Sequence, residues 1–498
     1  MDKGKEINTV SNATAWSFMG QLVIKILPLM TNMILARIFE PEVFGVVTTV
    51  TMITSFADIF CEAGFQKRLI CKNYKDAEDL NKDADVAFWT NFTISMVLWG
   101  VISLFRSELS SMLGKTDISK VIVVACVQLP ITSVISIQTA LNQRDYGFKR
   151  IFQAQFLGSV VSFVISIVLS FYGLSYWAII IGTISSCIVR ALVLSFKSRW
   201  KPKLYYSVNR LKEMFSFSIW VLLETIAVWF SSWTDSFFVG NGLSSHNLGI
   251  YRNSQSMVNG LLAVPQYSIT NVLLVKLTKD VEDTKKYSQD FLTAQRLLAY
   301  ALFPLGVGAF VYRDLAVKIV FGAGWEEAEI VVGLWALVSV VRIIFISMTN
   351  AVYVSKGIPK IAFYLQIIDI VILIPTCICG VRMGFEWFVV IRCIARIVAI
   401  IPNLYFLSRF CGFSAYEIIK NSVSPFLLSG LMGVCAVILK SFVNGNILVD
   451  FAVIGVCAAI YCMLLFLFAR KELIGIVNRI KSNHASTYPL LIADHRQI

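Results

Sequence analysis

Two arginines lie four residues apart in an apolar run near the C-terminal end of the chain. The run is WFVVIRCIARIVAII (387–401), and the arginines are Arg392 and Arg396. On a helix this spacing places both side chains on one face. Guanidinium groups form paired hydrogen bonds with phosphate or carboxylate oxygens. The pair therefore predicts either a phosphate-facing stripe or a structural ion-pair site.

Other ionisable residues also interrupt long apolar runs. A charge at the centre of a membrane helix costs roughly 2.5–3.5 kcal/mol, so such residues normally face a bundle interior or a wet cavity. The deep basic residues are Lys25, Arg342, Arg392 and Arg396. The acidic residues within the spans are Asp58, Glu62, Glu224, Asp235 and Asp369, of which Glu62 is close to the inner boundary. Salt bridges from the cations to Asp369 or Glu224 are one expectation, and a cationic cavity for an anionic ligand is the other.

The composition predicts a polytopic helical membrane protein. The 498 residues are 57% hydrophobic and only 15% charged, and the mean hydropathy is +0.72. Soluble proteins contain about 25% charged residues, and a β-barrel would need alternating segments of about 10 residues. Here apolar runs of about 20 residues recur, each long enough to cross a bilayer. The polar N-terminus lacks a small-residue cleavage site, so we expect the first span to be retained.

Fourteen spans are expected from these runs. Their ranges are 13–36, 44–65, 86–105, 119–139, 152–171, 176–196, 215–239, 252–274, 292–312, 328–351, 361–380, 385–407, 421–440 and 447–469. With the N-terminus inside, the inner loops and tails carry most of the 44 Lys and Arg residues, as the positive-inside rule requires. Both termini are therefore expected in the cytoplasm. The net charge of +13 orients the protein and does not indicate a nucleic-acid partner.

The loops argue against an enzyme. The longest has about 20 residues, and none contains a P-loop, GxSxG or HExxH motif. The eleven cysteines form no CxxC pair, and the three histidines lie outside the apolar runs, so no metal or cofactor is expected. A transporter needs no large loop, because its substrate site lies between helices at mid-membrane depth.

A weak internal repeat predicts two similar halves. A shift of 204 residues aligns Gly45 with Gly249, and a shift of 211 aligns Lys149 with Lys360. We expect two six-helix lobes related by a parallel repeat around a central cavity, 1–200 for spans 1–6 and 201–410 for spans 7–12. Residues 411–498 would hold two further spans and a cytoplasmic tail. Gly45 and Gly249 are expected in tight turns that need a permissive backbone.

Several motifs resemble one family. They are ILARIFEPEVFGVV with Asp58 and Gly64 after it, QTALNQRDYGFKR, YGLSYWA, RWKP, TDSFFVG followed by LGIYRNSQSM, FGAGWEEA and SKGIPK. Together they resemble the Wzx-type polysaccharide flippases, a branch of the multidrug/oligosaccharidyl-lipid/polysaccharide exporter superfamily. The resemblance covers most of residues 10–410.

The resemblance implies a function and a location. Such proteins flip undecaprenyl-pyrophosphate-linked oligosaccharide repeat units across the bacterial inner membrane, for O-antigen, capsule or exopolysaccharide assembly. The implied partners are the lipid-linked substrate, membrane lipids, and the polysaccharide polymerase and export machinery. The alternative is a cation-coupled exporter of small amphipathic drugs from the same superfamily. That function would favour an acidic cavity, whereas the deep residues here lean basic.

The candidate residues then take roles. Lys25, Arg342, Arg392 and Arg396 would hold the diphosphate, while Asp58, Glu224, Asp235 and Asp369 would serve coupling or gating. Trp229 and Trp233 lie one turn apart beside two of these acids and could stack on sugar rings. The alternative for the tryptophans is packing or an interfacial belt.

Overall fold

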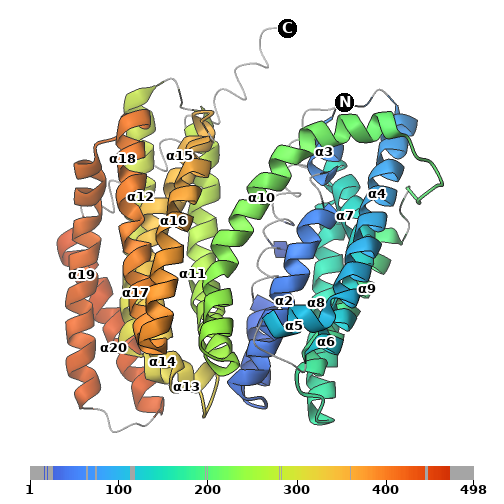
Figure 1. Ribbon diagram of the computed structural model, residues 1–498. Helices are drawn as coiled ribbons and strands as arrows, with labels where there is room; N and C mark the ends of the chain where they lie inside the picture. The colour runs from blue at the N-terminus through green and yellow to red at the C-terminus, as the bar shows by residue number, and fades with distance from the viewer. Residues whose placement is uncertain are drawn as a thin grey trace. The chain divides into compact units, whose positions relative to one another are not determined.

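The computed structural model is an all-helical protein. It describes residues 16, 19–20, 26–62, 65–72, 74, 76–112, 118–196, 198, 200–279, 281, 283–358, 360–442 and 447–470, and no strand occurs among them. Figure 1 shows the helices. Contacts between residues group the chain into two compact units, which are described separately below. The expected lobes 1–200 and 201–410 and the C-terminal part 411–498 stay a prediction.

Unit 1 comprises Met1–Val264, Val317–Val332 and Ala362–Ala399. Its helices are α2 (Pro41–Glu62), α3 (Phe65–Cys71), α4 (Ala77–Leu104), α5 (Arg106–Met112), α6 (Ser119–Ala125), α7 (Gln128–Arg144), α8 (Phe148–Phe171), α9 (Ser175–Ser195), α10 (Val208–Gly242), most of α16 (Lys360–Met383) and α17 (Phe385–Val398). The first part of α11 (Ser245–Lys279) also belongs to it.

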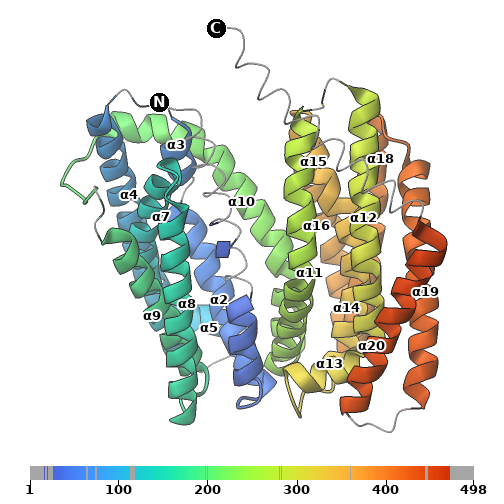
Figure 2. The same ribbon diagram turned by 180° about the vertical axis from the view of Figure 1, so that it is seen from behind.

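The core of unit 1 forms where α2, α4, α6, α7 and α9 meet. Val50, Ile122, Leu129 and Ile180 are buried there in one apolar cluster. Helix α8 packs mainly along α9, whereas α10 packs along α2, α3 and α4 (Figure 2). The two long helices α8 and α10 therefore have different neighbours.

Unit 2 comprises Pro265–Ala316, Gly333–Ile361 and Ile400–Ile498. It contains α12 (Thr284–Val311), α15 (Met348–Ser355), α18 (Ile400–Cys411), α19 (Ala415–Ser441), α20 (Ile447–Leu464) and two π-helical turns, Ile343–Ser347 and Leu465–Ala469. Helices α13 (Arg313–Val320) and α14 (Ala328–Arg342) each begin in one unit and end in the other.

A buried asparagine satisfies polar groups at the first π-helical turn. The Nδ2 atom of Asn403 donates to the Phe345 carbonyl at 2.8 Å, and its Oδ1 accepts from the Tyr353 hydroxyl at 2.8 Å. Carbonyls displaced by a π-turn need such external donors.

The membrane class expected from the sequence is confirmed. Eleven helices among the described residues are long and apolar enough to span a bilayer, and each coincides with one predicted span. Helices α10 and α11, 35 residues each, cover the predicted spans 215–239 and 252–274. The first predicted span is described mainly from Ile26 onward, so the count of fourteen stays a prediction. The predicted span 385–407 consists of two helices, α17 and α18, which meet at Ala399.

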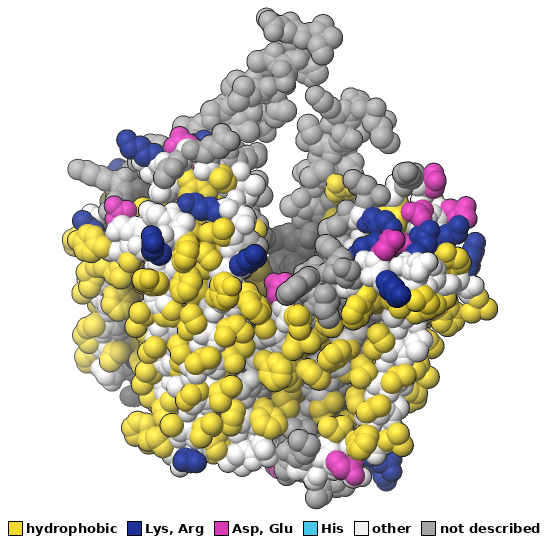
Figure 3. Space-filling model, turned by 45° about the horizontal axis from the view of Figure 1, so that its top comes forward, with side chains coloured by type: hydrophobic (Ala, Val, Ile, Leu, Met, Phe, Trp, Pro, Cys, Tyr) yellow, Lys and Arg dark blue, Asp and Glu magenta, His cyan; other side chains and the backbone are white. Residues whose placement is uncertain are grey.

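The surface separates apolar and charged side chains. Figure 3 shows hydrophobic side chains over most of the visible face, with most of the visible Lys, Arg, Asp and Glu toward its upper edge and a few at its lower edge. In unit 1 this edge includes α3 and the beginnings of α4 and α10. We call it the basic end of unit 1, because Lys72, Arg144, Lys149, Lys201 and Arg210 lie there.

The glycines aligned by the repeat do not lie in turns. Gly45 is inside α2 and Gly249 is inside α11, and both have ordinary helical backbones. A Cβ atom on Gly45 would stand 1.9 Å from the Ser245 carbonyl oxygen, and one on Gly249 would stand 1.8 Å from the Pro41 carbonyl oxygen. The expectation of turns is therefore wrong. These glycines let two helix backbones touch, which any side chain would prevent.

Candidate functional site

A buried carboxylate lies on α10. Asp235 is only 4% exposed. Its Oδ2 atom accepts a hydrogen bond from the Tyr251 hydroxyl on α11 at 3.0 Å, and its Oδ1 atom accepts from the Ser236 amide at 2.8 Å. Tyr251 is itself fully buried, with its ring edge-on to Phe388 at 5.5 Å. Two helices therefore fix the orientation of this carboxylate.

The cation facing Asp235 is Arg392 on α17. The distance from Arg392 Nε to Asp235 Oδ2 is 3.5 Å, and each side chain is 6% exposed. The described residues give Arg392 Nε no hydrogen-bond acceptor of good geometry. Glu224, one of the two partners expected from the sequence, is exposed, and the pair forms with Asp235 instead. The position of a residue along its predicted span could not reveal this pairing, because it does not show how α10 is rotated about its axis.

Two further candidates lie one helical turn away from this pair. Asp369, half-buried on α16, accepts a hydrogen bond from the Ser231 hydroxyl of α10 at 3.3 Å. Ser231 precedes Asp235 by four residues, so both face the same side of α10. Arg396 follows Arg392 by four residues and is half-buried.

The structure thus brings several candidates of unit 1 together where α10, α11, α16 and α17 meet. We call this group the polar seam; it consists of Ser231, Asp235, Tyr251, Asp369 and Arg392. Its members come from sequence segments far apart in the chain.

A further cation at this site was missed in the sequence. The guanidinium of Arg252, on α11, lies 4.1 Å from the ring centroid of Trp233. Its Nη1 atom donates to the Ser232 carbonyl at 3.3 Å and to Gln255 Oε1 at 3.4 Å. Arg252 stands at the first position of a predicted span, which suggested a loop residue. The position of Arg252 directly after Tyr251, inside the motif LGIYRNSQSM, is the sequence feature that could have identified it as a site residue.

The two candidate tryptophans line an apolar groove in unit 1. The groove has a volume of about 740 Å³ and is formed by α2, α4, α5, α10 and one residue of α16. The rings of Trp229 and Trp233 stack with centroids 6.5 Å apart, and Trp229 contacts Phe56 at 4.7 Å. The indole nitrogen of Trp229 donates to the Ser55 hydroxyl at 3.0 Å. Sugar stacking by these rings stays a prediction.

The remaining candidates are Asp58, Arg342 and Lys25. Asp58 on α2 accepts a hydrogen bond from the Thr132 hydroxyl of α7 at 3.1 Å. Arg342, in unit 2, is the last residue of α14, directly before a π-helical turn, and is half-buried. Lys25 lies outside the described residues.

A charged cluster at the basic end of unit 1 was not expected. Asp83 is 1% exposed and receives hydrogen bonds from Lys72 at 2.9 Å and from Arg210 at 2.6 Å. The Tyr74 hydroxyl donates to the same carboxylate at 3.0 Å. Burial, and then the Asp83 charge, raise the pKa of Tyr74 well above its usual range, so this phenol stays a donor.

The same end holds the RWKP motif in place. Asp85, also buried, accepts from the Trp200 indole nitrogen at 3.0 Å and from the Lys203 amide at 3.1 Å. Both acidic residues sit in the first turns of α4, and their partners come from loops and from α10. The cluster therefore clamps the segment 200–207 and the start of α10 to α4.

Comparison with known proteins identifies the family. A family model described as polysaccharide biosynthesis protein matches residues 34–330, more than half of the chain. The chain belongs to the polysaccharide biosynthesis protein family. This membership confirms the resemblance seen in the motifs. No group of three or more potential metal ligands occurs in the described part of this family member.

Curated relatives are distant and cover most of the chain. The succinoglycan biosynthesis transport protein ExoT of Rhizobium meliloti is 22% identical, over 66% of this chain and 66% of its own length. The lipopolysaccharide biosynthesis protein WzxC of Escherichia coli is 21% identical over 76% of each chain. Both names refer to polysaccharide biosynthesis, and that of ExoT describes a transport protein.

Solved structures share the fold. The lipid II flippase MurJ, in an inward closed conformation, has a TM-score of 0.74 at 15% identity and covers 93% of this chain and 99% of its own. A MATE transporter in complex with MaL6 has a TM-score of 0.53 at 14% identity, over 83% and 97%. At these identities the likeness shows the fold alone.

Proposed function

We propose that this protein flips undecaprenyl-pyrophosphate-linked oligosaccharide repeat units from the inner to the outer leaflet of the bacterial inner membrane. Family membership and the names of the polysaccharide-transport relatives support the substrate class. The observation that carries the proposal is the buried Asp235–Arg392 pair. Each side chain of this pair is only 6% exposed, and charges buried between membrane helices commonly mark substrate or ion paths.

In this proposal Arg392 changes partner during transport. A diphosphate carries about two negative charges and presents more acceptor oxygens than one carboxylate, so it competes with Asp235 for the guanidinium. When Arg392 turns to the phosphate, Asp235 is left as a buried carboxylate without a cation.

The other candidates extend this path. Arg396 lies one turn along α17, and Lys25 and Arg342 would add positive charge for the diphosphate. Asp369, Asp58 and Glu224 would serve coupling or gating. The sugars would occupy a wet cavity beside Trp229 and Trp233. Lobes 1–200 and 201–410 would rock about this cavity, with residues 411–498 as two additional spans.

We place the protein in the inner membrane with both termini in the cytoplasm, because this orientation puts the basic end of unit 1 on the cytoplasmic side. A polysaccharide polymerase and export machinery would accept the flipped units. These partners follow from the substrate class, because exported repeat units must be joined before they reach the cell surface.

Deletion of the gene tests this function. In the deletion strain we expect lipid-linked repeat units to accumulate on the inner leaflet and a surface polysaccharide to disappear, with wild-type protein restoring both. If the Arg392→Gln/Arg396→Gln protein, present at normal membrane levels, also restored both, the two arginines would have no part in transport. Unchanged polysaccharide together with greater susceptibility to cationic drugs would favour the multidrug exporter instead.

A further inference from the structure

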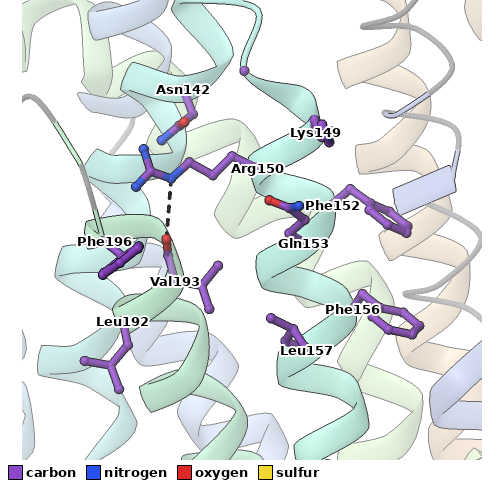
Figure 4. A pocket seen from close by; sticks show the side chains of 11 residues that line it. Asn142, Lys149, Arg150, Phe152, Gln153, Phe156, Leu157, Leu192, Val193 and Phe196 are labelled. Atoms are coloured by element: carbon purple, nitrogen blue, oxygen red, sulfur yellow. Dashed lines mark hydrogen bonds between the residues drawn. The ribbon is translucent and has the colours of Figure 1, made fainter.

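An amphipathic pocket lies between α8 and α9 at the basic end of unit 1 (Figure 4). Its volume is about 950 Å³. The pocket begins at the turn between α7 and α8, where Tyr146 adopts a left-handed backbone with φ of 55°. It continues along α8 toward the middle of the membrane. A cavity of this size can hold a lipid headgroup and the first part of its chains.

The end of the pocket nearest the loop carries hydrogen-bond donors and positive charge. Arg150 extends from the start of α8 toward α9, with the amides of Asn142 and Gln153 on the same side, whereas Lys149 lies on the side of α8 that carries Phe152 (Figure 4). Arg150 Nε donates to the Val193 carbonyl of α9 at 3.4 Å, which holds its guanidinium across the pocket. Among the described residues that line the pocket, none is acidic. This end therefore selects an anion.

The deeper part of the pocket is apolar and open to lipid. Phe156 and Leu157 stand about two turns along α8 from the cations. On the opposite wall Leu192 is 64% exposed and Phe196 is 70% exposed. Hydrophobic side chains so exposed within a membrane helix contact lipid chains. The pocket thus has positive charge at its loop end and apolar side chains deeper along α8, in the same order as the headgroup and acyl chains of a phospholipid.

An aromatic side chain marks the membrane–water boundary here. The Lys149 ammonium lies 5.6 Å from the ring centroid of Trp16, and the Trp16 ring contacts Phe152 at 5.2 Å. Tryptophan is enriched at the headgroup level of membranes. A tryptophan beside Lys149 agrees with a position at the level of the lipid headgroups.

We propose that this pocket binds an anionic phospholipid of the cytoplasmic leaflet, with its phosphate beside Arg150 and Asn142, with Lys149 adding positive charge from the other side of α8, and with an acyl chain along Leu157 and Leu192. The site is distinct from the polar seam: α8 packs mainly on α9 and α7, whereas α10 packs on α2, α3 and α4. The bound lipid joins the α7–α8 turn to the end of α9. It stabilises unit 1 independently of substrate.

Thermal unfolding of the purified full-length protein tests this site. The protein is titrated with dioleoyl phosphatidylglycerol and, separately, with dioleoyl phosphatidylcholine, and bound lipid is counted by native mass spectrometry. The variants are Lys149→Gln and Lys149→Gln/Arg150→Gln. Lys201→Gln is the matched control, since Lys201 is an exposed lysine at the same end but outside the pocket.

We expect phosphatidylglycerol to raise the unfolding temperature more than phosphatidylcholine does. Each Lys or Arg near a membrane surface contributes about 1 kcal/mol to the attraction for anionic lipid. Loss of one cation should therefore weaken lipid binding about fivefold, and loss of both should weaken it about 25-fold. Leu157→Trp, which fills the apolar part and leaves both cations, should also reduce binding. Lys201→Gln should bind as the wild type does.

Three results would overturn the proposal. Equal stabilisation by the two lipids would mean that the charges select nothing. Unchanged binding in the folded Lys149→Gln/Arg150→Gln variant would place the lipid elsewhere. Displacement of phosphatidylglycerol by equimolar undecaprenyl diphosphate, with loss of both in the double variant, would assign the pocket to the transport substrate. Since none of these results depends on flipping activity, the outcome is separate from that of the proposed function.

Discussion

The Asp235–Arg392 pair predicts a specific pattern in a double-mutant cycle. The variants are Asp235→Asn, Arg392→Gln and the combination of both. Asparagine keeps an acceptor for the Tyr251 hydroxyl, so Asp235→Asn removes mainly the charge. Each single variant leaves one buried charge without its partner, and the double variant leaves none.

The structure sets the size of the effect. At the 3.5 Å separation of Nε and Oδ2, an effective dielectric constant of about 20 gives an attraction of about 5 kcal/mol. Removing one partner of a buried pair typically destabilises a protein by roughly 3–5 kcal/mol, because the remaining charge stays desolvated. The double variant should recover much of this loss. We expect a coupling energy of at least about 2 kcal/mol.

Denaturant unfolding of the purified variants in detergent measures the cycle, and surface polysaccharide in a complemented deletion strain measures export. Both single variants should be destabilised, whereas the double variant should be more stable than either and yet fail to export. Additive stability effects would show that the two charges do not interact. Full export by the stable double variant would refute the exchange of Asp235 for phosphate.

Other predictions concern the rest of the protein. Gly45→Leu should abolish export, because its side chain would collide with the backbone at Ser245, whereas Gly100→Ala, which meets open space, should export normally. Asp83→Asn should lower the free energy of unfolding by about 1.5–3 kcal/mol, since hydrogen bonds to a charged group are weakened; unchanged unfolding would contradict the clamp. Burial alone would raise the pKa of Asp314, but the hydrogen bond and charge of Lys440 hold that pKa below its usual range. The Asp314–Lys440 pair therefore adds stability above about pH 4, and this stability is lost as the pH falls through the lowered pKa of Asp314 in the folded protein. Asp314→Asn should flatten this part of the curve of unfolding free energy against pH.

The helices were largely predictable from hydropathy. Apolar runs located the eleven spans among the described residues, because a helix is the only open-chain structure that satisfies its backbone inside lipid. Helix ends were less predictable. Helix α4 begins at Ala77, although its apolar run begins near residue 86, because Asp83 and Asp85 are paired and therefore tolerated inside the helix.

The site was predictable by residue type and not by pairing. Hydropathy identified Asp235 and Arg392 as charges inside spans, but their contact joins positions 157 residues apart and depends on how α10 and α17 are rotated. Arg252 was missed because it begins its span, where a cation is unremarkable. Its contact with Trp233 comes from the antiparallel return of α11 along α10.

The glycine pair shows another limit. The repeat aligned Gly45 with Gly249, but a glycine's sequence neighbours do not distinguish a turn from a close helix crossing. The steric cost of a Cβ atom appears only when α2 and α11 are seen together.

Reconstituted transport tests the central claim most directly. Purified protein is placed in liposomes that contain an undecaprenyl-diphosphate-linked oligosaccharide in the inner leaflet, and arrival of the sugar outside is followed with an impermeant glycosidase or lectin. Wild-type protein should expose the sugar well above the rate of protein-free liposomes, and the properly inserted Arg392→Gln/Arg396→Gln variant should not. Equal rates with and without the wild-type protein, or an undiminished rate in the variant, would contradict the account.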